Sequence, residues 1–354
     1  MDTGDNTEKL ESRVRSALRI GYPLCIRGGN TKAFYGRIPV GEPVDVRGHT
    51  GIVDYEPTEL VITARSGTTL NEIEAALAAE NQILPFDPPH FGEGATIGGT
   101  IACNLSGPRR AQAGAARDFI LGCGLINGTG EVLRFGGQVM KNVAGYDVSR
   151  LMCGALGTLG VLLEMSLKVL PKPETEETMR LEATPVQALD RMKAWGRRAL
   201  PVSATCQVNN SLYARLSGTG DAVAAARKQI GGESADQADA FWEALREHRL
   251  VELSNALPLW RLSVAPDSPP ADLEGNWVYE WNGALRWLSA DVPISQLREA
   301  AAAAGGHATL FRNSPDRDQV FHPLNGGLTK VHRRLKRAFD PAGIFNPGRM
   351  YPDL

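Results

Sequence analysis

The sequence predicts an α+β protein with two lobes. Its 354 residues are more than a single compact core usually holds. Glycine is concentrated before residue 161, whereas the chain beyond Pro171 and Pro173 alternates helical and strand-like segments. Because only glycine lets the main chain approach another group so closely, we expect the first lobe to wrap its backbone around a ligand.

Composition and charge exclude several classes of protein. Apolar residues make up 43% and charged residues 22% of the chain, and the net charge of −2 gives no electrostatic basis for binding nucleic acid or an anionic membrane. The N-terminus lacks the apolar segment of a signal peptide, and no apolar stretch approaches the roughly 20 residues of a membrane span. We therefore expect a cytoplasmic protein that reaches the inner face of a membrane only through partner subunits.

The cysteines predict a reduced protein that holds no metal. No two of them form a C-x-x-C pair, so neither an iron–sulfur cluster nor a zinc ion is expected within this chain. An odd number of scattered thiols fits a reducing compartment. The five positions are Cys25, Cys103, Cys123, Cys153 and Cys206.

Hydrophobic spacing predicts the elements of both lobes. An apolar strand over 23–27 ends in a Gly-Gly turn, and a helix over 70–80 begins after Thr69, with Glu72 completing a capping box. The other helices are expected over 10–20, 186–200, 221–230, 294–304 and 328–339. Further strands are expected over 45–53, 59–64, 131–135, 161–170, 204–208, 260–264 and 285–288.

The first candidate ligand loop is Arg27-Gly28-Gly29-Asn30-Thr31, directly after an apolar strand. Consecutive glycines can turn backbone N–H groups toward one point, which forms a nest for phosphate oxygens. Arg27 and Thr31 can add side-chain donors. The alternative is an ordinary turn after a strand, and this loop alone does not decide between the two.

Two more glycine-rich segments follow. Gly94–Thr100 leads into Ile101 and Leu105 at helical spacing, which favours a short helix with its glycine end toward a ligand over a surface loop. Gly154–Val161 has the spacing G-x-x-G-x-x-G and precedes a strand, whereas the dinucleotide fingerprint G-x-G-x-x-G follows one. A Rossmann site is therefore disfavoured.

In their order and spacing, these three segments together resemble the FAD-binding domain of the vanillyl-alcohol-oxidase or PCMH type. The similarity runs from about Tyr22 to Pro171 and recurs over 340–350. It implies a two-subdomain PCMH-type FAD-binding domain at 1–172 and a smaller α+β cap domain at 173–327 that serves a substrate or an interface. A C-terminal helix and tail, 328–354, would return to the FAD-binding domain.

The resemblance also implies which residues bind FAD. Relatives that bond the flavin covalently carry a histidine in the first loop, where this chain has Asn30, so we expect noncovalent FAD. The implied cofactor-binding residues are Arg27, Gly28, Gly29, Asn30, Thr31, Thr96, Ile97, Gly98, Gly99, Asn104, Gly107, Gly114, Asp118, Gly157, Gly160 and Val161.

Two further segments, Val139–Asp147 and Phe339–Met350, resemble the flavoprotein subunits of bacterial glycolate oxidases. The modest length and the stretch Asn104–Arg110 are typical of their shorter, E-type members. This resemblance implies an FAD-dependent oxidoreductase that converts glycolate, or a similar small 2-hydroxy acid, into the 2-oxo acid. It also implies two partners: a larger FAD-binding subunit and an iron–sulfur subunit that takes the electrons.

Two other functions stay open. The second lobe lacks the H-G-D-G-N-like motif of the larger subunits, and no catalytic residue can be assigned, so the chain could be a noncatalytic FAD-containing structural or electron-relay subunit. An NADPH-dependent reductase of the same fold is the other alternative. The histidines of this lobe are expected at the surface or in helices and not as metal ligands; they are His248, His307, His322 and His332.

Several side chains allow two interpretations. Arg109 and Arg110 form either a solvated turn or a guanidinium site near flavin or substrate carboxylate. Asp147, on a loop with Lys141 and Tyr146, is as readily an N-cap as a functional acid. The basic run Arg333, Arg334, Lys336 and Arg337 is a solvated helix face or a partner surface. Five tryptophans of the second lobe are expected in the core or at an interface; they are Trp242, Trp260, Trp277, Trp281 and Trp287.

Overall fold

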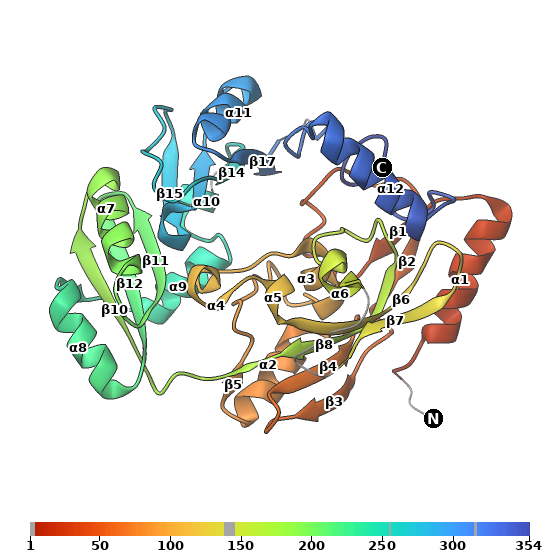
Figure 1. Cartoon of the computed structure of the whole chain (residues 1–354), viewed down its shortest axis with the longest axis horizontal. Coiled ribbons are helices and arrows are strands. Elements are labelled where there is room, and N and C mark those ends of the chain that lie inside the picture. Colours follow the sequence, from red (N-terminus) through yellow and green to blue (C-terminus); the bar gives the residue numbers. More distant parts are fainter. Residues whose placement is uncertain (1–3, 138–145, 255, 315–316) are drawn as a thin grey trace.

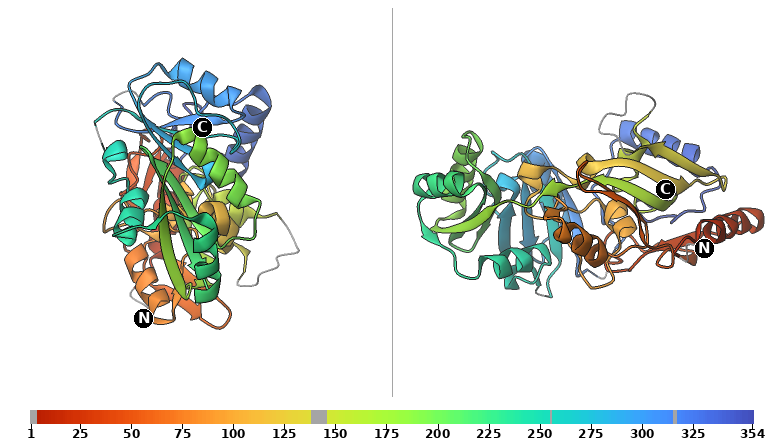
Figure 2. Two further views of the ribbon diagram at one scale, coloured as in Figure 1. Left: turned by 90° about the vertical axis from the view of Figure 1, so that its left-hand side faces the viewer. Right: turned by 90° about the horizontal axis from the view of Figure 1, so that it is seen from below.

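The computed structural model describes residues 4–137, 146–254, 256–314 and 317–354. Two lobes lie side by side along the long axis of the molecule (Figures 1 and 2). Each is built on an antiparallel sheet with helices packed against it, so the expected α+β class is confirmed. Lys141 and most of the segment Val139–Asp147 lie outside the described residues.

The first lobe contains a five-stranded sheet in the order β3-β4-β8-β6-β7. Its core lies between this sheet and the helices α2 and α3, where Ile73, Leu77 and Ile101 are fully buried. The strands are β3 (Ile52–Glu56), β4 (Val61–Arg65), β6 (Ile120–Ile126), β7 (Val132–Gly136) and β8 (Val161–Lys168). The helices are α2 (Leu70–Ala79), α3 (Ile97–Cys103), α4 (Arg110–Ala113), α5 (Ala116–Phe119) and α6 (Val148–Met152). A small pair, β5 (Gln82–Ile83) and β9 (Leu170–Pro171), leads to the second lobe.

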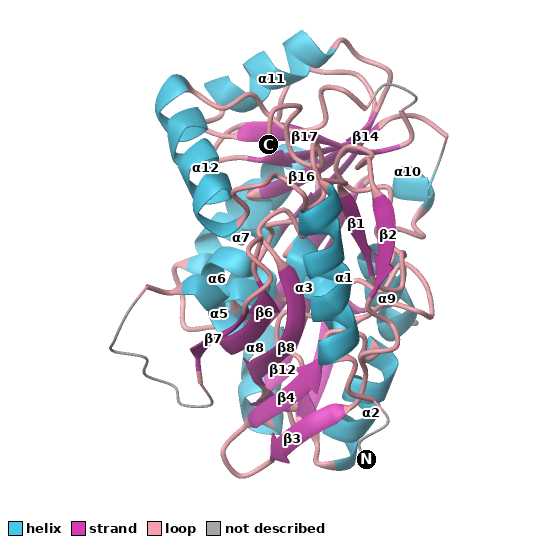
Figure 3. Cartoon of the chain, turned by 90° about the vertical axis from the view of Figure 1, so that its right-hand side faces the viewer, coloured by secondary structure: helices cyan, strands magenta, loops and turns pink. Residues whose placement is uncertain are grey.

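A parallel pair of strands carries the first glycine loop. β1 (Leu24–Arg27) pairs with β2 (Glu42–Asp45), and α1 (Thr7–Ile20) packs over them (Figure 3). The predicted strand over 45–53 is wrong. The chain turns after Asp45, where the N–H of His49 donates to the carbonyl of Val46 at 2.9 Å, and β3 begins only at Ile52. Gly51, with a φ of 114°, takes the backbone out of the extended region between the two strands.

The second lobe contains an eight-stranded antiparallel sheet in the order β13-β10-β12-β11-β15-β16-β14-β17. The helices and strands expected in this lobe are confirmed as α7, α8, α11, β11, β14 and β16. The strands are β10 (Thr175–Glu182), β11 (Val202–Val208), β12 (Ser211–Gly218), β13 (Glu233–Ser234), β14 (Leu259–Ser263), β15 (Asn276–Glu280), β16 (Leu285–Ser289) and β17 (His307–Arg312). The helices are α7 (Pro185–Gly196), α8 (Gly220–Ile230), α9 (Ala238–Arg246), α10 (Val251–Ser254), η1 (Trp281–Gly283) and α11 (Ile294–Ala303). Within the described ranges, no helix is long and apolar enough to cross a membrane.

One hydrophobic cluster joins the two lobes. It packs Phe34 and Cys103 of the first lobe against Trp281, Trp287 and Phe311 of the second. Four of the five tryptophans considered above are buried, and the fifth, Trp277, is partly buried against another cluster, so these residues are core. The expectation that His248 lies at the surface or in a helix is wrong, because its ring is buried against the rings of Phe91, Trp287 and Phe311.

The C-terminal segment packs against the first lobe. After α12 (Gly326–Phe339), the carbonyl of Ile344 accepts the N–H of Leu24 at 2.7 Å. The turn between them is held by Lys336, whose Nζ donates to the buried carboxylate of Asp340 at 2.7 Å. Lys336 is therefore not part of a solvated basic face, unlike Arg333, whose side chain is half exposed.

Replacing Asp340 should destabilise this anchor. Asp340 also accepts the N–H groups of Ile344 (3.0 Å) and Phe345 (2.8 Å), so Asp340→Ala leaves a buried ammonium and two donors without their partner. Removing one member of a buried pair costs about 3–5 kcal/mol, and urea unfolding should show a loss of that order. Asp353→Ala is the matched control. It removes the half-exposed partner of Arg333 and should cost less than about 1 kcal/mol. Equal effects of the two variants would contradict the anchor.

Candidate cofactor and active site

The described residues enclose a cavity of about 450 Å³ in the first lobe. Its walls come from the three glycine-rich segments, from the loop after the first of them and from the C-terminal tail. Among the predicted cofactor-binding residues, ten line it: Arg27, Gly28, Gly29, Asn30, Thr31, Thr96, Gly98, Gly99, Gly157 and Gly160.

The first two segments meet at distances that exclude side chains. A Cβ atom at Gly29 would overlap the carbonyl of Gly94, and one at Gly28 would overlap the hydroxyl of Thr96. A Cβ at Gly98 would lie only 2.7 Å from the Cβ of Ser66 and 2.8 Å from its carbonyl oxygen. The glycine pattern therefore reflects close backbone packing on two sides of the cavity.

Local signals in the sequence set these positions. Thr96 is the N-cap of α3, and its hydroxyl accepts the N–H of Gly99 at 3.3 Å. Asn30 adopts a φ of 61°, a left-handed conformation that asparagine tolerates better than most residues. Gly157 has a φ of 71°, and a Cβ there would lie 2.7 Å from Nδ2 of Asn346. The third wall thus depends on the C-terminal tail.

Six predicted residues lie outside the walls of this cavity. Ile97 and Val161 point into the hydrophobic cores, and Asn104 ends α3 with a φ of 50°. Gly107 packs against the carbonyl of Asp87. Gly114 and Asp118 belong to the short turn where the Asp118 carboxylate accepts the N–H of Ala115 at 2.9 Å. Their contact with a cofactor stays a prediction. Asp147 caps α6 by accepting the N–H of Arg150 at 3.1 Å, and Tyr146 is exposed.

The cavity walls carry positive charge that the glycine pattern did not reveal. Besides Arg27, the lining includes Lys32, Arg317 and Arg349, and none of the described residues contributes a carboxylate to it. Arg349 donates to the carbonyl of Tyr35 at 2.6 Å, and Lys32 to the carbonyl of His90 at 3.2 Å. Burial lowers the pKa of both groups, as expected for cations held away from water. Such a site suits an anionic group such as a pyrophosphate.

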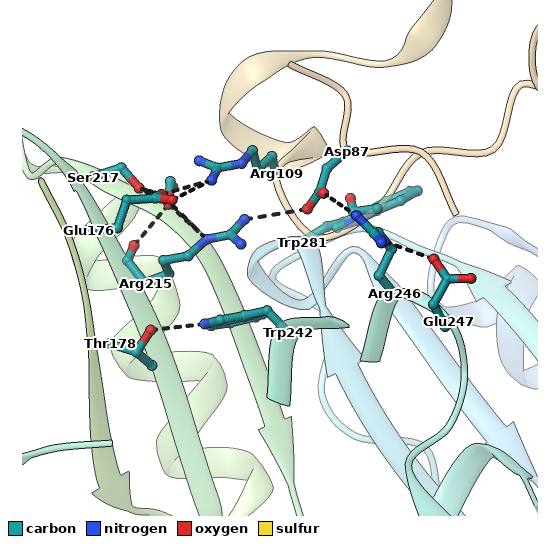
Figure 4. Close-up of polar contacts among 12 residues, drawn as sticks. Asp87, Arg109, Glu176, Thr178, Arg215, Ser217, Trp242, Arg246, Glu247 and Trp281 are labelled. Atoms are coloured by element: carbon teal, nitrogen blue, oxygen red, sulfur yellow. Dashed lines mark hydrogen bonds and ion pairs between the residues drawn. The ribbon is translucent and has the colours of Figure 1, made fainter. Parts of the chain in front are cut away.

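A row of charged side chains joins the two lobes (Figure 4). Arg109 pairs with Glu176 at 2.8 Å, and this ion pair is the structural role of Arg109. Asp87 lies between Arg215 and Arg246, at 3.5 Å from each. At the end of the row, Glu247 accepts the backbone N–H of Phe91 at 2.7 Å.

Arg110 and Arg261 meet at the seam between the lobes. Both guanidinium groups lie against the indole of Trp281, with the Arg110 carbon 4.4 Å and the Arg261 carbon 5.3 Å from the ring centre. Glu280 is buried beside them and accepts the indole N–H of Trp287 at 2.7 Å. Burial raises the pKa of Glu280 to about 7. No group of three or more His, Cys, Asp or Glu side chains within the described ranges is placed to hold a metal ion.

Known proteins resemble this chain in sequence and in fold. A family model described as "FAD binding domain" matches residues 3–136, and one described as "FAD linked oxidases, C-terminal domain" matches residues 321–350. The chain is 49% identical to "Glycolate oxidase subunit GlcE" of Escherichia coli (strain K12), over 99% of each chain. It is 32% identical to "Glycolate oxidase subunit GlcD" of Bacillus subtilis (strain 168), over 98% of this chain and 87% of the relative. In structure it resembles p-cresol methylhydroxylase, with a TM-score of 0.71 at 14% identity, over 98% of this chain and 88% of that one.

The fold, the glycine-walled cationic cavity and these matches together define a flavoprotein, an FAD-dependent oxidoreductase. The chain belongs to the FAD-linked oxidase family with a PCMH-type FAD-binding domain, and within that family it is similar over nearly its whole length to the GlcE subunit. The residues present fit the cofactor. Three glycine-rich segments contribute to the wall of a cavity of about 450 Å³, and the cations Arg27, Lys32, Arg317 and Arg349 match the pyrophosphate of a dinucleotide.

A side chain at Gly98 should abolish FAD retention. In Gly98→Val, the added carbons would displace the backbone of Ser66 and open the packing of two cavity walls. A distortion of about 2 kcal/mol or more raises the Kd for FAD at least roughly thirtyfold, so the purified variant should lose on dilution and gel filtration the FAD that the wild type retains. The flavin absorbance per chain measures this. Gly137→Val is the control, because among the described residues no atom beyond its chain neighbours lies within 4 Å of its added Cβ. Full flavin content in the Gly98 variant would show that this packing does not shape the site.

The Glu280 carboxyl should make stability depend on pH. Its folded pKa of about 7 lies above the ordinary 4.5, so the unfolded chain releases this proton first as the pH rises, and stability falls between these two values. The glutamine side chain in Glu280→Gln does not ionise, so this variant does not lose stability over that pH range. In urea unfolding, its stability relative to wild type should grow by about 2–3 kcal/mol between pH 5 and pH 8. Glu243→Gln, at an exposed carboxyl whose pKa is lowered by its hydrogen bond from Arg249, should show no such growth. A pH-independent difference for Glu280→Gln would contradict the raised pKa.

Proposed function

We propose that the chain is the FAD-binding subunit of a glycolate oxidase complex, which oxidises glycolate or a similar 2-hydroxy acid. The observation that carries this proposal is the 49% identity to a glycolate oxidase subunit over 99% of both chains. Because the match covers nearly all of both chains, the activity of the relative is the best guide to the activity of this chain. When bound, FAD supplies the two-electron acceptor for the α-carbon hydride.

The residues of this chain position the cofactor. Backbone N–H groups of the loop Gly28–Thr31, together with Lys32 and Arg349, would hold the pyrophosphate, and the walls at Gly98 and Gly157 would keep the rest extended. We propose that the FAD is noncovalent, because Asn30 offers no nucleophilic nitrogen or sulfur. The thiol of Cys103 also lines the cavity, but burial raises its pKa and keeps it protonated. Acid precipitation should therefore leave the yellow cofactor in the supernatant.

Partner subunits complete the proposed reaction. The described part of the chain offers no metal-binding cluster and no carboxylate or histidine on the cavity wall, so an electron acceptor and an added proton acceptor would come from elsewhere in the complex. We propose a larger FAD-binding subunit and an iron–sulfur subunit as these partners, in the cytoplasm, with any membrane contact made through them.

A noncatalytic role is the second candidate. None of the described residues that line the cavity is a carboxylate or a histidine, and this favours a noncatalytic role, because such a group would take the hydroxyl proton. In that case the flavin of this chain would relay electrons or stabilise the complex, and the chemistry would take place at the larger flavoprotein subunit.

Purification with and without the partners tests both candidates. A tagged chain from its native cells should bring down a larger flavoprotein and an iron–sulfur protein. Anaerobic glycolate should bleach the flavin of the complex, whereas NADPH should not. If glycolate bleaches only the flavin of the larger subunit, the relay candidate replaces the catalytic one. Recovery of the chain alone, with full glycolate oxidation, would overturn the subunit proposal.

A further inference from the structure

Two arginines from opposite lobes converge on one indole. Arg110 begins α4 in the first lobe, directly after the second glycine segment, and Arg261 lies on β14 of the second lobe. Their guanidinium carbons are 4.4 Å and 5.3 Å from the ring centre of Trp281. The indole Nε1 donates to the carbonyl of Gly107 at 3.0 Å, which fixes the ring between the lobes.

Neither guanidinium is neutralised by a side chain of the described residues. Among the described residues, the ion pairs at this seam are made by other arginines, such as Arg109, which pairs with Glu176 at 2.8 Å. Burial lowers the pKa of both arginines, and the charge of Arg261 lowers the pKa of Arg110 further. Two like charges therefore share a partly buried site.

The nearby acids balance this charge poorly. The charge of Asp118 raises the pKa of Arg110, but Asp118 is exposed to solvent. The charge of Glu280 raises the pKa of Arg261. The pKa of Glu280 itself is about 7, so this carboxyl is only partly ionised at neutral pH. Stacking on the indole ring stabilises one such arginine. Stacking alone does not explain two unneutralised arginines on one ring, because their mutual repulsion opposes it.

The pair lies next to the cofactor cavity. Cys103 and Phe34 line the cavity, and both pack in the cluster that contains Trp281. Tyr35, beside Phe34, is close enough to both Arg261 and Cys103 for their charges to act on its pKa. A small anion bound by the two arginines would therefore lie near the cavity end formed by Cys103 and Phe34.

We propose that Arg110 and Arg261, which share the indole of Trp281, bind the carboxylate of a small 2-hydroxy acid. The planar guanidinium fork matches a carboxylate in two hydrogen bonds, and contributions from both lobes close the seam around the ligand. The substrate class rests on the proposed function, whereas the anion site rests on the geometry alone. Both arginines are substrate-positioning residues in this assignment.

Calorimetry on the full chain with its FAD tests the site. The probe is oxalate, an anion without an α-hydrogen, and the uncharged comparison is glycolamide. Arg261→Gln and Arg110→Gln should each weaken oxalate binding roughly tenfold or more, since a charge-assisted hydrogen bond is worth about 1.5–3 kcal/mol. Arg261→Lys should retain part of the affinity. Arg117→Gln, an exposed arginine on the same stretch of chain, should change it less than about twofold.

The outcomes separate this site from the proposed function. Oxalate binding that is unchanged in both glutamine variants, with circular dichroism showing intact folds, would overturn the anion site. Glycolamide binding as tightly as oxalate would also overturn it. If the complex oxidises glycolate with an unaltered KM in Arg261→Gln, the proposed function stands and this site fails. If oxalate binds through the arginines but the complex leaves glycolate unoxidised, the site stands and the proposed substrate fails.

Discussion

The close approach of bare backbone segments is the constraint on which the cofactor site depends. Gly29 leaves no space for a Cβ beside the carbonyl of Gly94, and Gly98 leaves none beside Ser66. Because these contacts fix the loop after β1 against the start of α3, two walls of the cavity form a single packed unit. The glycines carry no chemistry of their own. They allow main-chain segments to pack so closely that no side chain would fit between them.

The far end of the chain completes the same site. The side chain of Asn346 accepts the N–H of Ile26 at 2.7 Å and donates to the carbonyl of Leu156 at 2.7 Å. One amide thus holds the strand before the first loop and the segment that carries Gly157. The Lys336–Asp340 pair sets the turn that delivers this amide, so a contact far from the cavity in sequence determines its third wall. The cavity can form fully only when the last residues have folded back.

Local patterns in the sequence predicted the parts of the site that depend on local structure. Thr69 caps α2 as expected, although its carboxyl partner Glu72 contributes its backbone N–H, and all three glycine segments reach the cavity. What failed depends on distant partners. β6 was missed because Gly122 and Gly124 are poor strand formers, and they are tolerated where they pack against neighbouring strands. The cavity cations Lys32 and Arg317 were missed because no local pattern distinguishes a lining lysine or arginine from a solvated one.

Arg109 and Arg110 make different contacts at the seam between the lobes. They are neighbours in sequence, yet Arg109 pairs with Glu176 (Figure 4). The guanidinium of Arg110 instead lies against the indole of Trp281. The pairing holds the second lobe at the edge of the first, because Asp87 makes two more cross-lobe pairs beside it. With Arg109 fixed there, Arg110 extends toward the indole that Gly107 holds. Paired charges therefore surround the seam, and the two guanidinium groups without an anionic partner among the described residues both lie against the indole of Trp281. A carboxylate bound at that point would complete the charge pairing of the whole interface.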